Sequence, residues 1–456
     1  RNLEMIRLLF NHKLLFIALL VISCISNANE NEVCEVPDEF ESENIKCGVQ
    51  AELIVLLRVI VISRYILYDV NRPEGFNLRR DVYIRVAVFM KELVEEDKKF
   101  KWKLVLPPWG NLYHWRTKDL GPQVRIPWGT FFNVDSLKKY IPVIEMQEFI
   151  DEYSQNAKET VLDTVYILQN DEEMFKTGKF KDKNVVKECS DDTLYYKMGT
   201  NKYGGDFWGY KNITAKNVKC VTFHGTISGL TQNLQPSVHR TVMFDHMEIP
   251  LHNYYGSQDY WTARRSMRYN SKLYSIANEF REKFLNSTNE WDNTEMPDDW
   301  TQQKERRTAI GGPYLCVHLR RRDFVTGRPS LVPSIKQAAS QLKKKLDELD
   351  LHVLFVATDT TTQEFEELQG HLQGYTVLKF KPSDDVLFEF KDGGVAILDQ
   401  IICSYARYFI GTDESTFSFR IQEDREIIGF PSETTFNRLC SKSGKCSATS
   451  RWEIVW

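Results

Sequence analysis

The sequence predicts an α/β protein with two Rossmann-like domains that face a central cleft. At 456 residues the chain is longer than one domain of ordinary size. From residue 313 onward, short apolar runs alternate with amphipathic helical patterns, which is typical of a parallel sheet covered on both faces. A second strand–helix–strand pattern lies between residues 64 and 106. We therefore place an N-terminal domain at residues 29–260 and a C-terminal domain at residues 261–456.

The N-terminal domain is expected to begin with a βαβ unit. Residues 64–70 form a mostly apolar run that predicts a buried strand, and Pro73 and Gly75 then signal a turn. Apolar residues from Val82 to Leu93 recur at helical spacing, and residues 102–106 predict the next strand. The crossover of such a unit is right-handed by strong preference, and ligands bind beyond the carboxyl ends of its strands.

Residues 110–260 follow a less regular pattern. Strands are expected at residues 140–146 and 221–224, and helices at residues 149–158 and, just past this region, 266–284. The polar stretch 171–217 predicts an insertion or surface subdomain, which we interpret as a candidate part of an acceptor site. His224 ends an expected strand and is interpreted as a structural histidine rather than a cleft residue.

The C-terminal domain is expected to repeat a strand–helix unit. Strands are predicted at residues 314–319, 351–357, 375–380 and 408–411, and helices at residues 335–349, 363–372, 395–406 and 415–424. The first of these helices places Ile335, Ala338, Leu342 and Leu346 on one face, as a helix that packs on a sheet requires.

The composition is that of a globular protein without a nucleic-acid partner. Hydrophobic residues make up 42% of the chain and charged residues 27%, and the net charge is −4. Because the sequence has no long basic run, we expect no binding to nucleic acid.

The first 28 residues predict a secretory signal peptide. Arg7 and Lys13 precede the apolar run 14–22, and residues 26–28 are small at the cleavage spacing. The apolar run is shorter than the roughly 20 residues that span a membrane, so no stable membrane span is expected. Removing residues 1–28 takes away a net charge of +2 and leaves −6. The apolar run 53–62 is interrupted by Arg58, which disfavours a second span.

The cysteines support a secretory compartment. Nine cysteines become eight once Cys24 leaves with the signal peptide, and an even number predicts disulfides. The expected pairs are Cys440–Cys446, Cys189–Cys220 and Cys34–Cys47. Cys316 and Cys403 lie inside apolar runs and are expected to be buried free thiols. Acceptor sequons at Asn212 and Asn286 agree with a lumenal location.

Two stretches of the C-terminal domain predict a phosphate site. Arg320, Arg321 and Arg322 follow the strand 314–319 directly, and planar guanidinium groups bind phosphate well. The strand 408–411 leads through residues 412–416 straight into a helix, whose N-terminus attracts anions. The alternatives are a solvated charged loop for the arginines and ordinary N-capping by Asp413 or Ser415 for the helix.

Glu74 stands at the carboxyl end of the first strand of the N-terminal domain. In that loop it is a candidate general base, and the alternative is a first-turn acid that favours the positive end of the helix. A base in one domain and a phosphate site in the other are typical of a nucleotide-sugar glycosyltransferase. No Asp-x-Asp motif occurs in the sequence, so a metal held by such carboxylates is not expected.

Four motifs in order resemble one family. They are residues 69–80 (Asp-Val-Asn-Arg-Pro-Glu-Gly-Phe-Asn-Leu-Arg-Arg), 107–110 (Pro-Pro-Trp-Gly), 318–324 (His-Leu-Arg-Arg-Arg-Asp-Phe) and 411–420 (Gly-Thr-Asp-Glu-Ser-Thr-Phe-Ser-Phe-Arg). Together they resemble the thrombospondin-repeat protein O-fucosyltransferase family, from about residue 65 to the C-terminal cysteines. Arg72 and Arg322 stand where the resemblance leads us to expect smaller residues.

The resemblance implies a GT-B fold and an inverting enzyme that needs no metal or other cofactor. It implies GDP-fucose as the donor, Ser or Thr hydroxyls of folded thrombospondin type 1 repeats as acceptors, and the lumen of the endoplasmic reticulum as the location; a monomer is expected. Glu74 would accept the proton, Arg320 would bind the diphosphate and take part in catalysis, and Asp399 would hold the guanine or ribose. The donor site would comprise Pro73, Gly75, Phe76, Asn77, His318, Leu319, Arg320, Asp399, Ser415, Thr416 and Phe417.

Two other functions remain open from the sequence. An O-fucosyltransferase that acts on EGF repeats would share the donor site, and a non-catalytic lumenal folding factor would bind thrombospondin repeats without transfer. A kinase-like enzyme or sulfotransferase would be expected to carry a Gly-x-x-x-x-Gly-Lys loop, which the sequence lacks.

Overall fold

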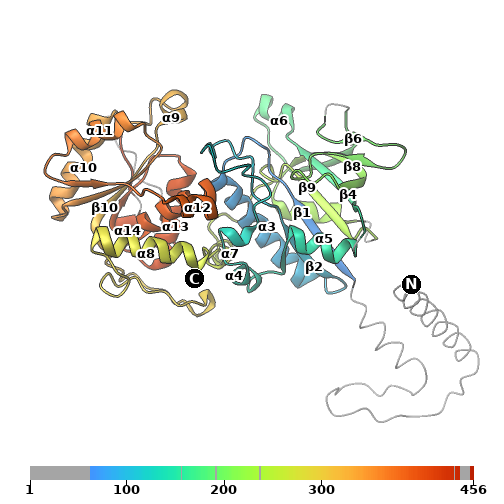
Figure 1. Ribbon diagram of the computed structural model, residues 1–456. Helices are drawn as coiled ribbons and strands as arrows, with labels where there is room; N and C mark the ends of the chain where they lie inside the picture. Colours follow the sequence, from blue (N-terminus) through green and yellow to red (C-terminus); the bar gives the residue numbers. More distant parts are fainter. Residues whose placement is uncertain (1–61, 156, 191–192, 236–237, 436, 442–451) are drawn as a thin grey trace, which may run out of the picture. The chain divides into compact units, whose positions relative to one another are not determined.

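A computed structural model describes residues 62–155, 157–190, 193–235, 238–435, 437–441 and 452–456 (Figure 1). The chain divides into a small unit, Arg1–Ser63 with Lys99–Lys101, and a large unit, Arg64–Lys98 with Trp102–Trp456. The large unit carries all of the candidate site residues, from Pro73 to Phe417. The predicted signal peptide, the Cys34–Cys47 pair, nearly all of the apolar run 53–62 and Cys446 of the Cys440–Cys446 pair lie outside the described residues.

The first sheet has nine strands in the described part of the chain. They are β1 (Ser63–Tyr68), β2 (Lys101–Leu106), β3 (Val143–Glu145), β4 (Thr160–Gln169), β5 (Lys183–Lys187), β6 (Tyr196–Lys197), β7 (Tyr203–Gly204), β8 (Ile213–His224) and β9 (Thr241–Asp245). Their order is β3-β2-β1-β9-β4-β8-β7-β6, with β5 paired to β8. Parallel pairings join β1 with β9, β9 with β4, and β4 with β8. The short strands β5, β6 and β7 run antiparallel to their neighbours.

The βαβ unit predicted at residues 64–106 is confirmed. Residues 65–68 of β1 are at most 1% exposed, as expected for a strand covered on both faces. Helix α3 (Phe76–Glu96) follows β1 and leads to β2, which lies beside β1. The central strands β4 and β9 were not predicted from the sequence, and β8 is longer than the predicted strand 221–224. The polar stretch 171–217 forms α6 (Glu172–Thr177), the strands β5 to β7 and the start of β8, so it extends the sheet.

The helix predicted at residues 266–284 is confirmed as α8 (Ser271–Leu285), which begins five residues later than predicted, and a separate helix precedes it. Helix α7 (Gln258–Ser266) ends before Asn270, whose side chain accepts a hydrogen bond from Lys272 N and begins α8. An N-cap of this kind offers the backbone an alternative to a continuous helix. The shorter helices nearby are η1 (Trp128–Thr130), α4 (Val134–Lys138), α5 (Met146–Ser154), η2 (Ile227–Leu234) and η3 (Trp300–Gln302).

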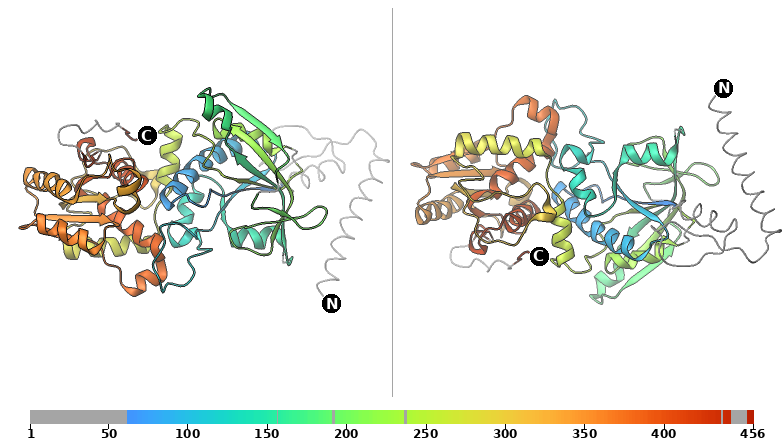
Figure 2. Two further views of the ribbon diagram at one scale, coloured as in Figure 1. Left: turned by 90° about the horizontal axis from the view of Figure 1, so that it is seen from above. Right: turned by 90° about the horizontal axis from the view of Figure 1, so that it is seen from below.

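The second sheet confirms the parallel α/β pattern predicted for the C-terminal half. Its order is β12 (Thr376–Leu378), β11 (Val353–Thr358), β10 (Gly312–Leu319) and β13 (Ala406–Ile410), all parallel. The helices are α9 (Arg322–Gly327), α10 (Ile335–Leu349), α11 (Thr362–His371), α12 (Asp384–Ser404), α13 (Thr416–Ile428) and α14 (Ser432–Thr435). Apolar residues of α10 and α11 share one buried cluster with β10 and β11. Figure 2 shows the ribbon from two further directions.

Helix α12 begins eleven residues earlier than predicted and contains a break. Lys391 has φ 54° and ψ −167°, so two helical segments meet there. The segment after the break carries Asp399. Across the described ranges, no helix combines the length and apolar character needed to cross a bilayer.

Two disulfides link described cysteines. The predicted bond Cys189–Cys220 is confirmed. The prediction of free thiols at Cys316 and Cys403 is wrong, because these two residues form a disulfide between β10 and α12. The strand and the helix pack with the two Cα atoms 5.3 Å apart, which is within the span of a disulfide, and this contact between distant segments has no signal in the sequence.

Candidate functional site

A cavity of about 630 Å³ brings together the two candidate stretches of the sequence. Of the predicted site residues, Pro73, Glu74, Gly75, Phe76, Asn77, His318, Arg320, Asp399, Ser415, Thr416 and Phe417 all line it. Leu319 does not: its side chain is 1% exposed in the cluster beneath α10, because successive strand residues point to opposite faces. The placement of Leu319 in the donor site therefore stays a prediction, and any contact there would involve its backbone rather than its side chain.

Glu74 lies in the loop between β1 and α3. Helix α3 begins at Phe76 with Gly75 as its N-cap, so Glu74 stands outside the first turn. The interpretation of Glu74 as a first-turn acid is therefore not supported. Burial and the nearby charge of Glu248 raise the pKa of the half-buried Glu74 carboxyl, and the Arg79 charge opposes them. A carboxylate with a raised pKa is a stronger base than an exposed one.

Arg320 stands at the end of β10, where two carboxylates and a histidine hold it. Its guanidinium pairs with Asp359 and, at 2.5 Å, with Asp323 Oδ1. Its Nη2 lies 3.4 Å from His114 Nε2, and its backbone N donates to Thr412 Oγ1 at 3.0 Å. These contacts hold the charged group in the cavity before any ligand arrives.

The neighbouring arginines have different environments. Arg321 donates to Glu364 Oε1 at 2.9 Å and to the Pro333 carbonyl at 2.7 Å, so it fastens the loop after β10 to α11 and to the segment before α10. Arg322 lines the cavity and donates to the Asp359 carbonyl at 3.0 Å. The solvated-loop alternative therefore does not describe this stretch.

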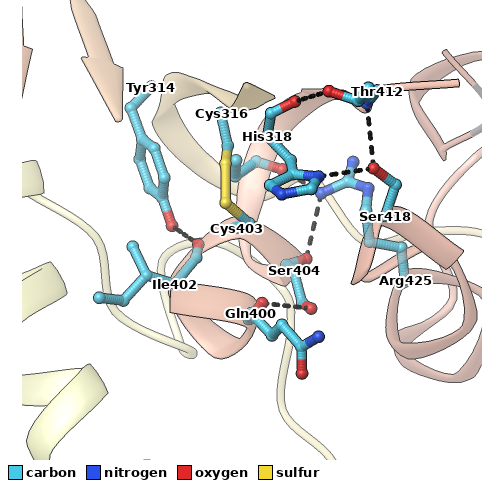
Figure 3. Close-up of a disulfide and its surroundings, with 11 residues drawn as sticks. Tyr314, Cys316, His318, Gln400, Ile402, Cys403, Ser404, Thr412, Ser418 and Arg425 are labelled. Carbon is cyan, nitrogen blue, oxygen red and sulfur yellow. Dashed lines mark hydrogen bonds between the residues drawn. A yellow bond between two sulfur atoms is a disulfide. The ribbon is translucent and has the colours of Figure 1, made fainter. Parts of the chain in front are cut away.

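His318 is a buried, neutral imidazole. Its ring stacks on Phe417 with centroids 4.2 Å apart, and burial together with the Arg320 charge lowers its pKa to about 3. Nδ1 lies 2.8 Å from Ser418 Oγ, which also accepts from Thr412 N at 3.0 Å (Figure 3). The Ser418 hydroxyl therefore links the His318 ring to the backbone of Thr412.

The N-terminus of α13 has no side-chain cap among the residues that the structure describes. Ser415 is the N-cap residue but makes no side-chain capping hydrogen bond, and Asp413 pairs instead with Arg438. The predicted alternative of N-capping by Asp413 or Ser415 is therefore wrong. The first-turn N–H groups of α13, beside Ser415 and Thr416 in the cavity wall, can meet an anion.

Asp399 carries a buried oxygen that is unpaired within the described part of the chain. Burial raises its pKa to about 8, and the Lys379 charge only partly offsets this. The oxygen is Oδ1, and no described residue hydrogen-bonds to it. An unpaired buried oxygen is costly, so this carboxyl is suited to N–H or O–H donors of a ligand in the cavity.

The Cys316–Cys403 disulfide lies next to two cavity-lining side chains, His318 and Asp399. Cys316 and His318 are two residues apart on β10 and share a face, as Asp399 and Cys403 do four residues apart on α12. The Cys316–Cys403 bond therefore ties together the strand and the helix that carry His318 and Asp399 (Figure 3).

Asn77 presents a nitrogen donor to the cavity. Its Oδ1 accepts from Gln400 Nε2 at 2.8 Å, and Gln400 in turn accepts from Arg80 Nη1 at 2.6 Å. Because the oxygen is engaged, the amide NH₂ of Asn77 is the group suited to a ligand acceptor.

The loop after β2 supplies cavity residues that the sequence did not reveal. His114, Trp115, Arg116 and Thr117 line the cavity. Thr117 N and Gln123 Nε2 donate to Asp392 Oδ2 at 3.0 and 2.9 Å, next to the break in α12. Burial and the Arg320 charge lower the pKa of His114. The aromatic run 113–115 after a strand end was the available signal.

By contrast His224, interpreted as structural, is absent from this cavity wall and stacks on Phe180.

Among the side chains that the structure describes, no three His, Cys, Asp or Glu residues are grouped so that they could hold a metal ion. The groups that line the cavity include the Glu74 carboxylate, the Arg320 guanidinium and the uncapped N-terminus of α13. This set can accept a proton at one point and stabilise a developing phosphate charge at another.

Comparisons with known proteins agree with this chemistry. A family model for GDP-fucose protein O-fucosyltransferase matches residues 65–428. The chain is 45% identical over 396 residues to GDP-fucose protein O-fucosyltransferase 2 of Homo sapiens, covering 86% of this chain and 90% of that protein. It is 42% identical over 402 residues to the protein of the same name from Caenorhabditis elegans, covering 86% and 91%.

Solved structures show the same mixed α/β fold. The structure of POFUT1 in complex with GDP-fucose superposes with a TM-score of 0.54 at 17% identity and covers 83% of this chain and 98% of that chain. At this identity the likeness concerns the fold. The family match and the relatives are decisive, and the chain belongs to the GDP-fucose protein O-fucosyltransferase family.

Proposed function

We propose that this protein transfers fucose from GDP-fucose to Ser or Thr hydroxyls in folded thrombospondin type 1 repeats, with inversion at the anomeric carbon. The proposal includes a GT-B arrangement of two Rossmann-like domains, no metal or other cofactor, a monomeric enzyme and a location in the lumen of the endoplasmic reticulum. The observation that carries it is that Glu74 and Arg320 line one cavity together with the uncapped N-terminus of α13.

The residues divide the reaction between two ends of the cavity. Glu74 takes the proton from the acceptor hydroxyl while the hydroxyl oxygen forms a bond to the anomeric carbon of fucose. The bond from that carbon to the β-phosphate oxygen breaks, and the electron pair leaves with GDP. Arg320 and the first-turn N–H groups of α13 stabilise the charge that develops on the diphosphate. A single displacement of this kind inverts the anomeric centre.

The nucleotide is held by buried side chains of the C-terminal half. Neutral His318 stacks on Phe417, and Asp399 gives up its proton and accepts from the guanine or ribose. Residues 114–117 line the cavity and help to exclude water, which competes with the acceptor in any glycosyl transfer.

The direct test is incubation with GDP-fucose and a folded thrombospondin repeat, followed by intact mass measurement. One added deoxyhexose is expected on the folded repeat, and none on the reduced and unfolded repeat or on a folded EGF repeat. Addition to the EGF repeat would show the wrong acceptor class, and binding without addition would indicate a folding factor. The anomeric configuration of the product, read by NMR, tests inversion.

Two variants separate the proposed roles. Glu74→Ala is expected to bind GDP with nearly unchanged affinity and to lose transfer, since general-base catalysis contributes about 10²- to 10⁴-fold. Arg320→Ala is expected to weaken GDP binding and transfer together. Transfer near the normal rate in Glu74→Ala, or unchanged GDP affinity by calorimetry in Arg320→Ala, would refute the respective role.

A further inference from the structure

The Arg79 guanidinium donates hydrogen bonds to four residues of the loop that carries Glu74. Its Nε donates to the Glu74 carbonyl at 3.1 Å, and its Nη1 donates to Asp69 Oδ1 at 3.1 Å. Its Nη2 donates to the carbonyls of Val70 and Asn71, at 2.8 and 3.1 Å. All four acceptors belong to residues 69–74, the connection between the end of β1 and the start of α3.

The loop needs such a cation because its carbonyl groups converge. The carbonyl oxygens of Val70, Asn71 and Glu74 all point at one guanidinium, and the Asp69 carboxylate adds a negative charge. Oxygen dipoles brought this close repel one another unless a donor lies between them. A planar guanidinium with its donors in a fixed fork can bind all four at once, whereas a lysine ammonium has three donors and no planar fork.

The remaining contacts of the loop hold its first residues rather than joining its two ends. Asp69 N donates to the Phe244 carbonyl at 3.0 Å, Met247 N donates to the Asp69 carbonyl at 3.0 Å, and Val70 N donates to Asp69 Oδ1 at 2.8 Å. Arg72 forms an ion pair with Asp206.

Glu74 N donates to the Asn71 carbonyl at 3.0 Å, and Asn71 N donates to Glu248 Oε2 at 3.0 Å. Pro73 has no N–H to donate, and the N-cap Gly75 has no side chain to cap α3. Arg79 is therefore the group that connects the two ends of the loop.

The adjacent Arg80 has an unrelated environment. It is fully buried and donates to Gln400 Oε1 at 2.6 Å and to Tyr269 Oη at 2.7 Å, away from the loop. The Arg79 side chain is not in the wall of the 630 Å³ cavity, so it has no contact with a donor bound there. Its effect on the reaction acts through Glu74: its hydrogen bonds fix the position of the loop, and its charge lowers the pKa of the Glu74 carboxyl. Arg79→Lys keeps the charge and loses the fork of donors, so this variant separates the two effects.

We propose that Arg79 is a positioning residue for the reaction: it fixes the loop 69–74 so that the Glu74 carboxylate meets the acceptor hydroxyl. This inference rests on the proposed role of Glu74 as the base. Misplacement of a catalytic group by about 1 Å can cost about 100-fold in rate, and loss of the four contacts would allow such a shift.

The test compares Arg79→Lys and Arg79→Gln with a control at Arg307. Arg307 is a comparable arginine: it donates to both oxygens of Glu426, at 2.8 and 2.6 Å, and to the Phe430 carbonyl at 3.0 Å, distant in the sequence from the Glu74 loop. For each variant we would measure kcat and the KM for GDP-fucose, with a folded thrombospondin repeat as acceptor. The GDP dissociation constant and the melting temperature are measured without acceptor.

Arg79→Lys is expected to lower kcat about 10-fold and Arg79→Gln about 100-fold, with the GDP dissociation constant within about twofold of the parent. Arg307→Gln is expected to lower the melting temperature and leave kcat unchanged. A further measurement uses Arg79→Ala with millimolar guanidinium ion, which is expected to restore part of kcat, while methylammonium restores less. Rescue by the lost functional group decides the question even if Arg79→Gln fails to fold.

An unchanged kcat in folded Arg79→Gln, or equal losses of GDP affinity and kcat, would overturn the proposal for Arg79. Failure of rescue by guanidinium in a folded Arg79→Ala protein would do the same. These outcomes are distinct from failure of the proposed function, which would appear as transfer by Glu74→Ala or as no transfer by the parent enzyme.

Discussion

Removing the Cys316–Cys403 disulfide is expected to weaken both the fold and nucleotide binding, whereas removing Cys189–Cys220 weakens the fold alone. The bonds span 87 and 31 residues of sequence. By the chain-entropy relation, loops of these lengths correspond to about 4.6 and about 3.7 kcal/mol of stabilisation. The two double alanine variants should therefore lose similar amounts of unfolding free energy.

Nucleotide binding distinguishes the two bonds because only the Cys316–Cys403 bond lies next to side chains that line the cavity. Without the Cys316–Cys403 bond, His318 and Asp399 are carried by a strand and a helix that are no longer covalently joined. Ordering each side chain on binding costs about 1 kcal/mol, so the GDP dissociation constant should rise about 30-fold. The Cys189→Ala/Cys220→Ala variant should bind GDP as the parent does.

The assay is calorimetric titration of GDP into both double variants below their melting temperatures. Because the sulfurs of Cys316 and Cys403 are fully buried, alkylation in denaturant without reductant, followed by peptide mass mapping, tests the bond in the parent protein. Equal GDP affinities of the two double variants would refute the argument. Alkylation of Cys316 or Cys403 in the denatured, unreduced parent would refute the bond itself.

Three further predictions concern ionisation and hydrogen bonding in the cavity. Glu248→Gln removes a charge that raises the pKa of Glu74, so the acid limb of the kcat profile should move to lower pH; an unmoved limb would contradict that coupling. With its pKa raised to about 8, Asp399 is mostly protonated at pH 7 and should release a proton when it accepts donors from GDP, so affinity should rise with pH up to about 8. Titrations in buffers of different ionisation enthalpy measure this release, and identical enthalpies would count against it. Ser418→Ala leaves Nδ1 of His318 without its partner and should cost about 1–3 kcal/mol of stability together with some GDP affinity, measured by thermal unfolding and calorimetry; a fully stable variant would show that the hydrogen bond contributes nothing.

The second sheet could be predicted almost completely from the sequence because its signals are local. Each strand is a short apolar run, and α10 shows its buried face in the spacing from Ile335 to Leu346. The first sheet was harder, since its central strand β9 has only five residues and is recognised through its neighbours β1 and β4 rather than by its own pattern.

In the candidate site, too, features with a local sequence signal were predicted and features set by distant residues were not. Glu74, Arg320 and the α13 terminus were found because each lies in the segment that follows the carboxyl end of a strand. The loop 113–117 is positioned by Asp392, which is far away in the sequence, and the Cys316–Cys403 bond joins residues 87 apart. Local sequence patterns do not show which distant residues are in contact, and for this reason the prediction of free thiols at Cys316 and Cys403 was wrong. Leu319 was included with its motif although the alternation of a strand directs its side chain to the core.

The base and the diphosphate site differ in how they are encoded. Glu74, its loop and Arg79 all lie within residues 69–79, whereas the cavity-lining residues of β10, α12 and α13 lie between positions 318 and 417. The first part can be exchanged between related enzymes as a single short block if Glu248, which accepts from Asn71 N, is kept. The second can be exchanged only as nearly a whole half of the protein, because a strand, a helix and the disulfide joining them must change together.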